Sequence, residues 1–222
     1  MVSQTIQNYL KVIYKLQNRH GADGSVNTTF LSETMGVTAA SVTGMYKKLA
    51  EMQLVRHTPY KGVSLTDSGE KVALEVVRRH RLLERYLMET LGYSWDEVDA
   101  EANRFEHVIS EEFENRIDKA MGHPRIDPHG DPIPTQDGSI ALEDTQRLSE
   151  VDVGKRVLIK RVSDEDPNML RYMEDLGLVP SATVDVRERA PFNGPLLVAV
   201  TPGDEHALGL EVADHIFVVE TE

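Results

Sequence analysis

The chain contains no cysteine, which excludes disulfide bonds, thiolate zinc sites, iron–sulfur clusters and cysteine nucleophiles. It also has no run of about 18 apolar residues, the length that a membrane-spanning helix needs. The N-terminal segment mixes polar and apolar residues and does not resemble a secretion signal. We therefore expect a soluble cytoplasmic protein, in which any metal is held by nitrogen, oxygen or methionine sulfur.

Basic residues are scarce overall, with 24 against 37 acidic residues and a net charge of −13 over 222 residues. Residues 1–70 depart from this average, because they hold seven basic and five acidic side chains, a net charge of +2 that leaves −15 for the remainder. An acidic remainder is usually only a solvated surface. The first third, however, can approach a phosphate backbone.

Helical spacing and capping residues organise the N-terminal third. Apolar residues from Ile6 to Leu16 recur at helical spacing, and the glycines near residues 21–24 predict a turn. Asn27 is a candidate cap for a short helix through Thr34, Gly36 breaks that helix, and Thr38 is a candidate cap for a longer one. Residues 54–66 alternate around Tyr60-Lys61-Gly62, which predicts a two-stranded wing. The order of these elements predicts a winged helix–turn–helix.

The second helix of such a pair enters the major groove of DNA with its N-terminal residues facing base edges. Ala39, Ala40 and Gly44 would let its backbone come close, and lysines and arginines on the helix and wing would meet phosphates. The candidate DNA contacts are Thr38, Ala39, Ser41, Thr43, Lys47, Lys48, Arg56 and Lys61, with His57 beside them on the wing. Because the positive excess is modest, a protein-binding winged helix is the alternative.

Two further helical stretches follow. The segment 67–91 is predicted to be one long helix, with His80 and Glu84 four residues apart on one face. The segment 96–121 is predicted to be a second helix, with Asp99, Asn103, Glu106 and His107 on one stripe. These donors suit a metal, although His80 and Glu84 could equally form an ion pair, and Glu106 and His107 could face solvent. Apolar helices after a DNA-binding unit often pair with a second copy.

Four prolines between residues 124 and 134 prevent a helix, and the polar run that follows to about residue 149 predicts a linker. His123, Asp127, His129 and Asp131 in this segment could form a metal cluster, but His and Asp in proline-rich turns more often stabilise the turn itself. Residues 150–222 alternate over short runs broken by Gly, Pro and Asp. They predict a small β-barrel with one helix near residues 169–177.

Five motifs in series resemble the diphtheria toxin repressor family of metal-dependent transcriptional regulators, which includes a manganese transport regulator branch. They are NYLKVIYKL, SVT, RRHRLLERYL, EANRFEHVISEEFENRI and HPRIDPHGDPIP, and the resemblance covers essentially the whole chain. It implies a mainly α fold with a small β domain. The implied domains are a winged helix–turn–helix DNA-binding domain (1–70), a helical metal-binding and dimerisation domain (71–122), a proline-rich linker (123–149) and an SH3-like, FeoA-like β-barrel (150–222).

The resemblance also implies a mechanism, in which divalent metal at two sites fixes the DNA-binding domain relative to the dimerisation domain. A homodimer then binds a palindromic operator. The primary ligands carried over from the family are Asn8, Asn103, Glu106 and His107, with Asn103 able to offer its main-chain carbonyl. The family usually has Met or Asp at the first of these positions and Cys or Glu at the second. Two neutral amides lack both softness and charge, so we expect Mn²⁺, bound weakly, with Fe²⁺ as the alternative.

The ancillary site implied by the resemblance uses His80, Glu84 and Asp99, where the family often has His at the last position. The tail segment SDEDPNML would add Glu165 and Asn168, for which Asp164 or Asp166 could substitute.

The leading hypothesis is thus a manganese-dependent repressor of metal-uptake genes, with an iron-dependent repressor of the same family as the alternative. A metal-dependent hydrolase is a remote third, because the sequence shows no Ser-His-Asp spacing, Gly-rich phosphate loop or HExxH motif. A metal buffer without a DNA role is disfavoured by the predicted wing. We expect no enzymatic activity, no membrane partner and no small organic substrate.

Overall fold

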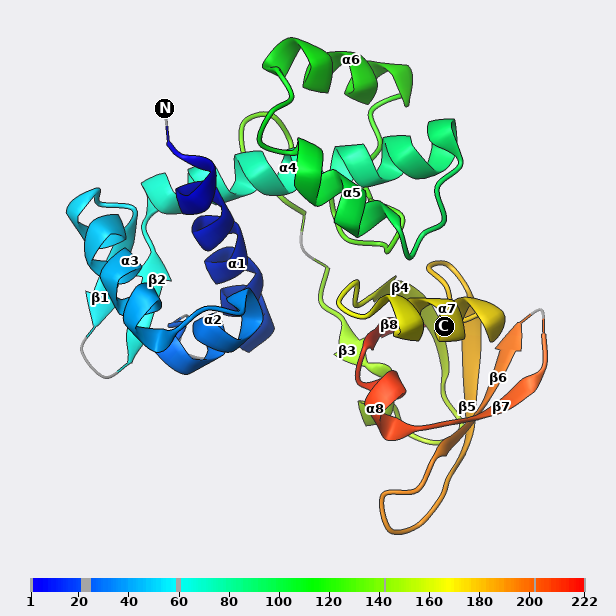
Figure 1. Cartoon of the computed structure of the whole chain (residues 1–222). Helices are drawn as coiled ribbons and strands as arrows, with labels where there is room; N and C mark the ends of the chain where they lie inside the picture. The colour runs from blue at the N-terminus through cyan, green and yellow to red at the C-terminus, as the bar shows by residue number, and fades with distance from the viewer. Residues whose placement is uncertain (1, 21–24, 59–60, 142, 202, 222) are drawn as a thin grey trace. The chain divides into compact units, whose positions relative to one another are not determined.

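The computed structural model of the chain describes residues 2–20, 25–58, 61–141, 143–201 and 203–221 (Figure 1). The chain divides into two compact units. One comprises Met1–Arg79 with Pro134–Ser139, and the other comprises His80–Ile133 with Ile140–Glu222. We call them the N-terminal unit and the C-terminal unit.

The N-terminal unit contains the predicted order of three helices and a hairpin. Its elements are α1 (Gln4–His20), α2 (Thr28–Met35), α3 (Ala39–Glu51), β1 (Val55–Thr58) and β2 (Gly62–Leu65). The capping predictions are confirmed, since Asn27 accepts a hydrogen bond from Phe30 N and Thr38 accepts one from Ser41 N. Gly36 ends α2 with a φ of 63°, a conformation that glycine adopts at little cost. The expected turn at residues 21–24 and Tyr60 of the wing turn lie outside the described residues.

Long-range hydrogen bonds join the hairpin and helices of the N-terminal unit. The two strands are antiparallel, with Val55 opposite Leu65. Leu65 N donates to Gln17 Oε1 of α1 at 2.9 Å, and the buried Tyr46 hydroxyl of α3 donates to Val26 O at 3.0 Å. Because Val42, Tyr46 and Leu49 bury one face of α3, the opposite face of this helix is left exposed.

Three helices form the middle of the chain: α4 (Asp67–Leu91), α5 (Val98–Phe105) and α6 (Glu111–Ala120). The prediction of a single helix over residues 96–121 is wrong, because the chain turns between Glu106 and Ser110. The Ser110 side chain accepts a hydrogen bond from Phe113 N, and acidic residues fill the first turn of α6. Both features favour a new helix start at this point, and they outweigh the continuing apolar period.

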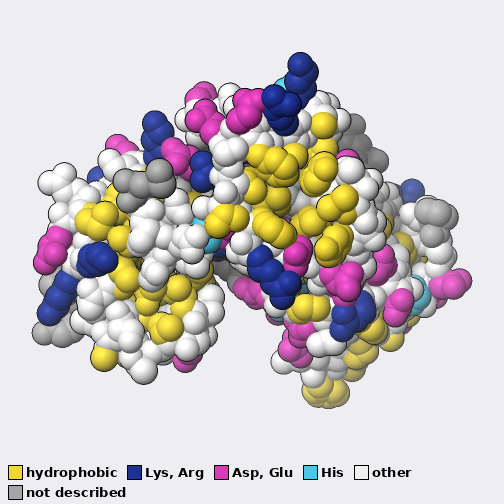
Figure 2. Space-filling model, turned by 45° about the horizontal axis from the view of Figure 1, so that its top comes forward, with side chains coloured by type: hydrophobic (Ala, Val, Ile, Leu, Met, Phe, Trp, Pro, Cys, Tyr) yellow, Lys and Arg dark blue, Asp and Glu magenta, His cyan; other side chains and the backbone are white. Residues whose placement is uncertain are grey.

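Large apolar side chains remain exposed around α5 and α6. Figure 2 shows hydrophobic side chains gathered on one face of the molecule, and the exposed large residues of this segment are Leu91, Tyr93, Phe105, Val108 and Phe113. An exposed apolar group of this kind is typical of a protein–protein interface.

The proline-rich segment after α6 contains no helix, as its prolines predict, yet it is held against α4. Arg81 Nη1 donates to Pro132 O at 2.5 Å, and Arg85 Nη1 donates to Ile126 O at 3.3 Å. Ile126 and Pro132 form an antiparallel bridge within the segment. The first part of the predicted linker, up to Ile133, is therefore ordered and held against α4. We call this part the proline-rich strap.

The remaining residues form a six-stranded antiparallel sheet in the order β3-β8-β4-β5-β6-β7. Its elements are β3 (Gln146–Arg147), a 3₁₀ turn (Leu148–Glu150), β4 (Arg156–Val162), α7 (Pro167–Asp175), β5 (Thr183–Arg189), β6 (Leu196–Thr201), β7 (Glu205–Leu208), α8 (Leu210–Ala213) and β8 (Ile216–Glu220). Within the described residues the predicted barrel is not closed, because β3 and β7 remain edges. Register shifts in β4 and β5 bend the sheet, but β3 pairs over only two residues.

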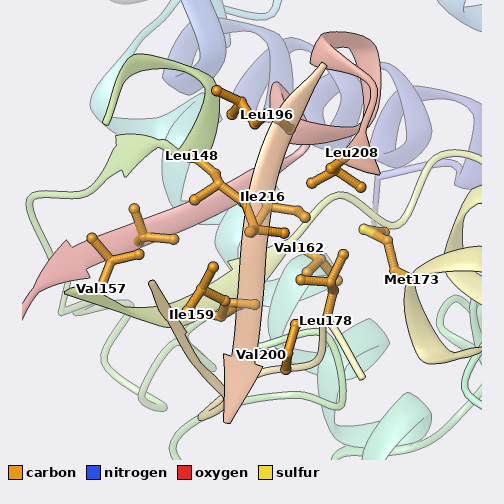
Figure 3. Close-up of a cluster of buried hydrophobic side chains, with 14 of the residues drawn as sticks. Leu148, Val157, Ile159, Val162, Met173, Leu178, Leu196, Val200, Leu208 and Ile216 are labelled. Carbon is orange, nitrogen blue, oxygen red and sulfur yellow. The ribbon is translucent and has the colours of Figure 1, made fainter. Parts of the chain in front are cut away.

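Strands and α7 enclose an apolar core. Figure 3 shows these side chains pointing toward one another: Leu148, Val157, Ile159, Val162, Met173, Leu178, Leu196, Val200, Leu208 and Ile216. Trp95, from the connection between α4 and α5, belongs to the same buried cluster. Among the described residues, no helix is long and apolar enough to cross a membrane.

Candidate metal centre

Four side chains from three parts of the C-terminal unit converge on one point. His80 and Glu84 lie one turn apart on α4, Asp99 lies in the first turn of α5, and Asp164 lies between β4 and α7. Each offers a ligand atom within 4.8 Å of the others. His80 and Glu84 are each 1% exposed, so this group of acids is not an ordinary solvated surface.

The hydrogen bonds of His80 decide which of its ring nitrogens is available. Nδ1 lies 2.7 Å from Oε2 of the buried Glu106. Because a carboxylate only accepts, Nδ1 carries the hydrogen. Nε2 then faces Glu84 Oε1 at 3.3 Å and Asp99 Oδ1 at 3.1 Å. An imidazole lone pair between carboxylate oxygens is a place for a cation or a proton, and a carboxylate behind a ligating histidine is the usual support in metal sites.

A second group of potential ligands shares Glu84 with the first and adds Asp127 and His129. His129 Nε2 donates to the Trp95 carbonyl at 2.8 Å, which leaves Nδ1 as the acceptor nitrogen, 3.7 Å from Glu84 Oε1. All three residues are buried, and neither Glu84 Oε1 nor His129 Nδ1 has a hydrogen-bond partner. Buried polar atoms without partners are costly, so the pair fits a bound cation.

Asp127 also shapes the turn that carries it. Its Oδ1 accepts hydrogen bonds from the main-chain N–H groups of His129 and Asp131, both at 2.9 Å. Its Oδ2 lies 3.4 Å from Arg81 Nε. The turn role that we favoured from the sequence is therefore present, and the same side chain also faces the second group. His123 and Asp131 lie in neither group, because they pair with Asp118 and Arg81.

Burial and neighbouring charges together raise the pKa values of two members of this second group, Asp127 and His129. Burial, reinforced by Glu84 and Asp131, raises the pKa of Asp127 to about 8, although Arg81 and His129 oppose the rise. Burial lowers the pKa of His129, but the carboxylates of Glu84, Asp127 and Asp164 more than offset this and raise it overall. A divalent cation that binds here must displace those protons.

The residues predicted for the primary site lie in several places. Glu106 ends α5, with Oε2 on His80, and His107 Nε2 lies 3.2 Å from Glu106 Oε1. Asn103 Nδ2 donates to the main-chain and side-chain oxygens of Asp99. Asn8 lies on α1 in the N-terminal unit. The ligand roles of Asn8, Asn103, Glu106 and His107 stay predictions.

The tail region contributes Asp164 to the first group, one of the two residues that we named as substitutes. Glu165 is in neither group of histidines and carboxylates found among the described residues. The Asn168 side chain donates to Asp166 and accepts from Arg171. The ligand roles of Glu165 and Asn168 stay predictions. Asp127 and His129 are buried beside Glu84, and no spacing rule reveals this from the sequence.

The candidate DNA-contacting side chains share the exposed surface of α3 and the hairpin. The exposed residues are Thr38, Ala39, Ser41, Thr43, Lys47, Lys48, Arg56 and Lys61. Local hydrogen bonds hold three of the hydroxyls, since Thr38 Oγ1 and Ser41 Oγ lie 2.9 Å apart and Thr43 Oγ1 donates to Ala39 O. These exposed groups can reach a groove while the opposite face of α3 packs in the core.

A helical unit with an exposed α3, followed by buried histidines and carboxylates, defines a class of metal-sensing DNA-binding regulators, and comparison with known families agrees. Residues 1–63 match the iron dependent repressor N-terminal DNA binding domain. Residues 66–135 match the iron dependent repressor metal binding and dimerisation domain, and residues 146–220 match the FeoA domain. The chain belongs to the diphtheria toxin repressor family, whose members are metal-dependent transcriptional repressors and not enzymes. This excludes the hydrolase alternative.

Both an iron-dependent relative and manganese-dependent relatives are similar to this chain. The iron-dependent repressor IdeR of Mycobacterium tuberculosis (strain H37Rv) is 31% identical over 217 residues, which cover 91% of this chain and 90% of the relative. A solved manganese-dependent transcriptional repressor in complex with manganese is 41% identical, with a TM-score of 0.89 over 97% of this chain and 99% of the other. The manganese regulator SloR is 33% identical, with a TM-score of 0.80 over 97% and 98%.

Proposed function

We propose that this protein is a Mn²⁺-responsive transcriptional repressor of metal-uptake genes that binds palindromic DNA as a homodimer. The observation that carries the proposal is the pair of ligand groups that share the buried Glu84. A carboxylate with one unsatisfied oxygen between two oriented imidazoles stabilises a divalent cation and is costly without one.

The donor chemistry favours manganese over iron as the physiological ion. The two groups combine the carboxylates of Glu84, Asp99, Asp127 and Asp164 with the imidazoles of His80 and His129. Hard oxygen donors suit Mn²⁺, whereas soft sulfur donors would favour later transition metals. Similarity to a manganese-dependent transcriptional repressor and to the manganese regulator SloR supports this choice. The similarity to an iron-dependent repressor keeps Fe²⁺ as the second candidate.

DNA binding and dimerisation are assigned to separate surfaces. The exposed residues of α3 and the hairpin would contact the operator, with Lys47 and Lys48 on phosphates. The exposed apolar residues around α5 and α6 would pack against a second copy, which presents two recognition helices to a palindrome. When bound, the cation supplies positive charge that offsets the negative charge of the buried carboxylates. It favours the DNA-competent arrangement only by as much as it binds that arrangement more tightly.

Mn²⁺ binding measured by electron paramagnetic resonance tests the proposal, because the signal of free Mn²⁺ disappears as the protein binds it. Glu84→Gln keeps size and polarity but removes the shared charge, and we expect a loss of affinity of at least about tenfold. Glu89→Gln, on the same helix in an exposed ion pair with Arg85, is the matched control and should bind as the wild type does. Equal Mn²⁺ affinity in Glu84→Gln and wild type would contradict the assignment. An anaerobic titration in which Fe²⁺ activates operator binding and Mn²⁺ does not would favour the iron alternative.

A further inference from the structure

Asn103 and Asp99 form a local pair one turn apart on α5. Asn103 Nδ2 lies 2.9 Å from the Asp99 main-chain carbonyl oxygen and 2.9 Å from its carboxylate Oδ2. Both partners are acceptors only, so the amide nitrogen, and not the amide oxygen, must point at them. The orientation of this amide is therefore defined by its partners. The Asn103 side chain acts as a donor toward Asp99.

The other oxygen of the same carboxylate faces the candidate metal centre. Asp99 Oδ1 lies 3.1 Å from His80 Nε2, and Asp99 shares a group with His80, Glu84 and Asp164. Unlike the buried Glu84, the Asp99 side chain is 34% exposed, so packing alone does not hold its carboxylate. A hydrogen bond to Oδ2 restricts rotation of the carboxylate and keeps Oδ1 directed at the imidazole.

A side-chain amide at position 103 is better suited to holding the Asp99 carboxylate than a carboxylate or an amine would be. An Asp or Glu at position 103 would lose the donor and place a like charge one turn from Asp99. A Lys would donate, but it would bring a permanent positive charge beside a site for a cation. Asn is short, neutral and able to donate, so it can direct a carboxylate without competing for the metal or repelling it.

We propose that Asn103 is a positioning residue, which acts on the metal centre by holding the Asp99 carboxylate toward His80. This inference rests on the proposed function, and it gives the amide a role different from the ligand role predicted from the family resemblance. The two roles of position 103 predict opposite effects of an added carboxylate. A carboxylate introduced at position 103 adds a charged oxygen donor, which would strengthen binding if residue 103 were a ligand, but it weakens binding if residue 103 must donate to Asp99.

A double-mutant cycle with Mn²⁺ alone as the probe tests this inference, using electron paramagnetic resonance for affinity and thermal melting for folding. We expect Asn103→Leu and Asn103→Asp each to weaken Mn²⁺ binding about tenfold, the loss typical of a disrupted support for a metal ligand. In the Asp99→Ala background, Asn103→Leu should have no further effect, because the group through which it acts is gone. Ala100→Asp, which adds the same charge at an exposed position of α5, is the control for long-range electrostatics and should bind as the wild type does.

The outcomes separate this inference from the proposed function. Tighter Mn²⁺ binding by Asn103→Asp would overturn it, and so would an equal effect of Asn103→Leu with and without Asp99, since either result means that position 103 acts directly. Unchanged binding by Asn103→Leu in the wild-type background would also overturn it. If Asp99→Ala itself binds Mn²⁺ as the wild type does, the metal centre of the proposed function is wrong, whatever the result at position 103.

Discussion

Gly44 lies in the middle of α3 (Ala39–Glu51), where glycine is a poor choice for stability. Its φ is not in the left-handed region, and a Cβ built on it would meet no atom within 4 Å. Alanine is favoured over glycine in a helix interior by about 0.8–1 kcal/mol. Gly44→Ala should therefore stabilise the N-terminal unit, and a gain of this size raises the melting temperature of a small domain by about 4–8 °C.

The same substitution should weaken DNA binding, because Gly44 is exposed on the face of α3 that carries the candidate DNA contacts. A methyl group inserted into a packed interface costs about 1–3 kcal/mol, which is at least a fivefold loss of affinity. Fluorescence anisotropy with labelled operator DNA in saturating Mn²⁺ measures this loss. The slope of affinity against salt should not change, since no charge is removed. A variant that melts higher and binds DNA equally well or better would refute the placement of Gly44 against the groove.

Three further predictions concern other parts of the chain. Lys47→Ala should weaken binding to all DNA sequences alike and lower the salt slope by about one, whereas a loss at a single base position would mean that Lys47 reads a base. Gly130→Ala should destabilise the C-terminal unit by about 1–3 kcal/mol or more, because φ at Gly130 is +91° and the new Cβ would lie 2.1 Å from Lys160 O. Urea unfolding measures this loss, and an unchanged midpoint would contradict the close packing of Gly130. Since Asp127 and His129 both have raised pKa values in the folded state, the stability that these two groups contribute without metal should fall as pH rises from about 5 toward about 8, while Mn²⁺ affinity rises over the same range. Metal-free unfolding that shows rising stability between pH 5 and 8 would be inconsistent with those shifts.

Local chemistry made much of the fold predictable. Asn27, Gly36 and Thr38 mark helix ends through hydrogen bonds that span three residues or through one backbone conformation, so the boundaries of α2 and α3 follow from the sequence. The break before α6 carried a similar signal in Ser110, but the apolar period that continues through it concealed the break. The open sheet was not predictable, because alternation indicates strands without indicating whether edge strands meet.

The candidate metal centre could be predicted only in part from the sequence. The four-residue spacing of His80 and Glu84 places them on one face of α4, and the family resemblance marks them, with Asp99, as candidate ligands. Asp127 and His129 lie on a proline-rich strap, whose path depends on Arg81, Arg85 and Trp95 and therefore on contacts distant in sequence. The spacing of Asn103 identified it as a candidate but could not show that its amide nitrogen points at Asp99.

The most direct test of the account is the affinity for operator DNA with and without metal at one ionic strength. A labelled fragment enriched from a genomic DNA pool is titrated with the full chain in EDTA, in Mn²⁺ and, anaerobically, in Fe²⁺, with anisotropy as the readout. The account predicts tight binding in Mn²⁺, weaker binding in Fe²⁺ and only salt-sensitive, non-specific binding in EDTA. Equal affinity in EDTA and in Mn²⁺ would contradict the claim that the buried centre controls DNA binding.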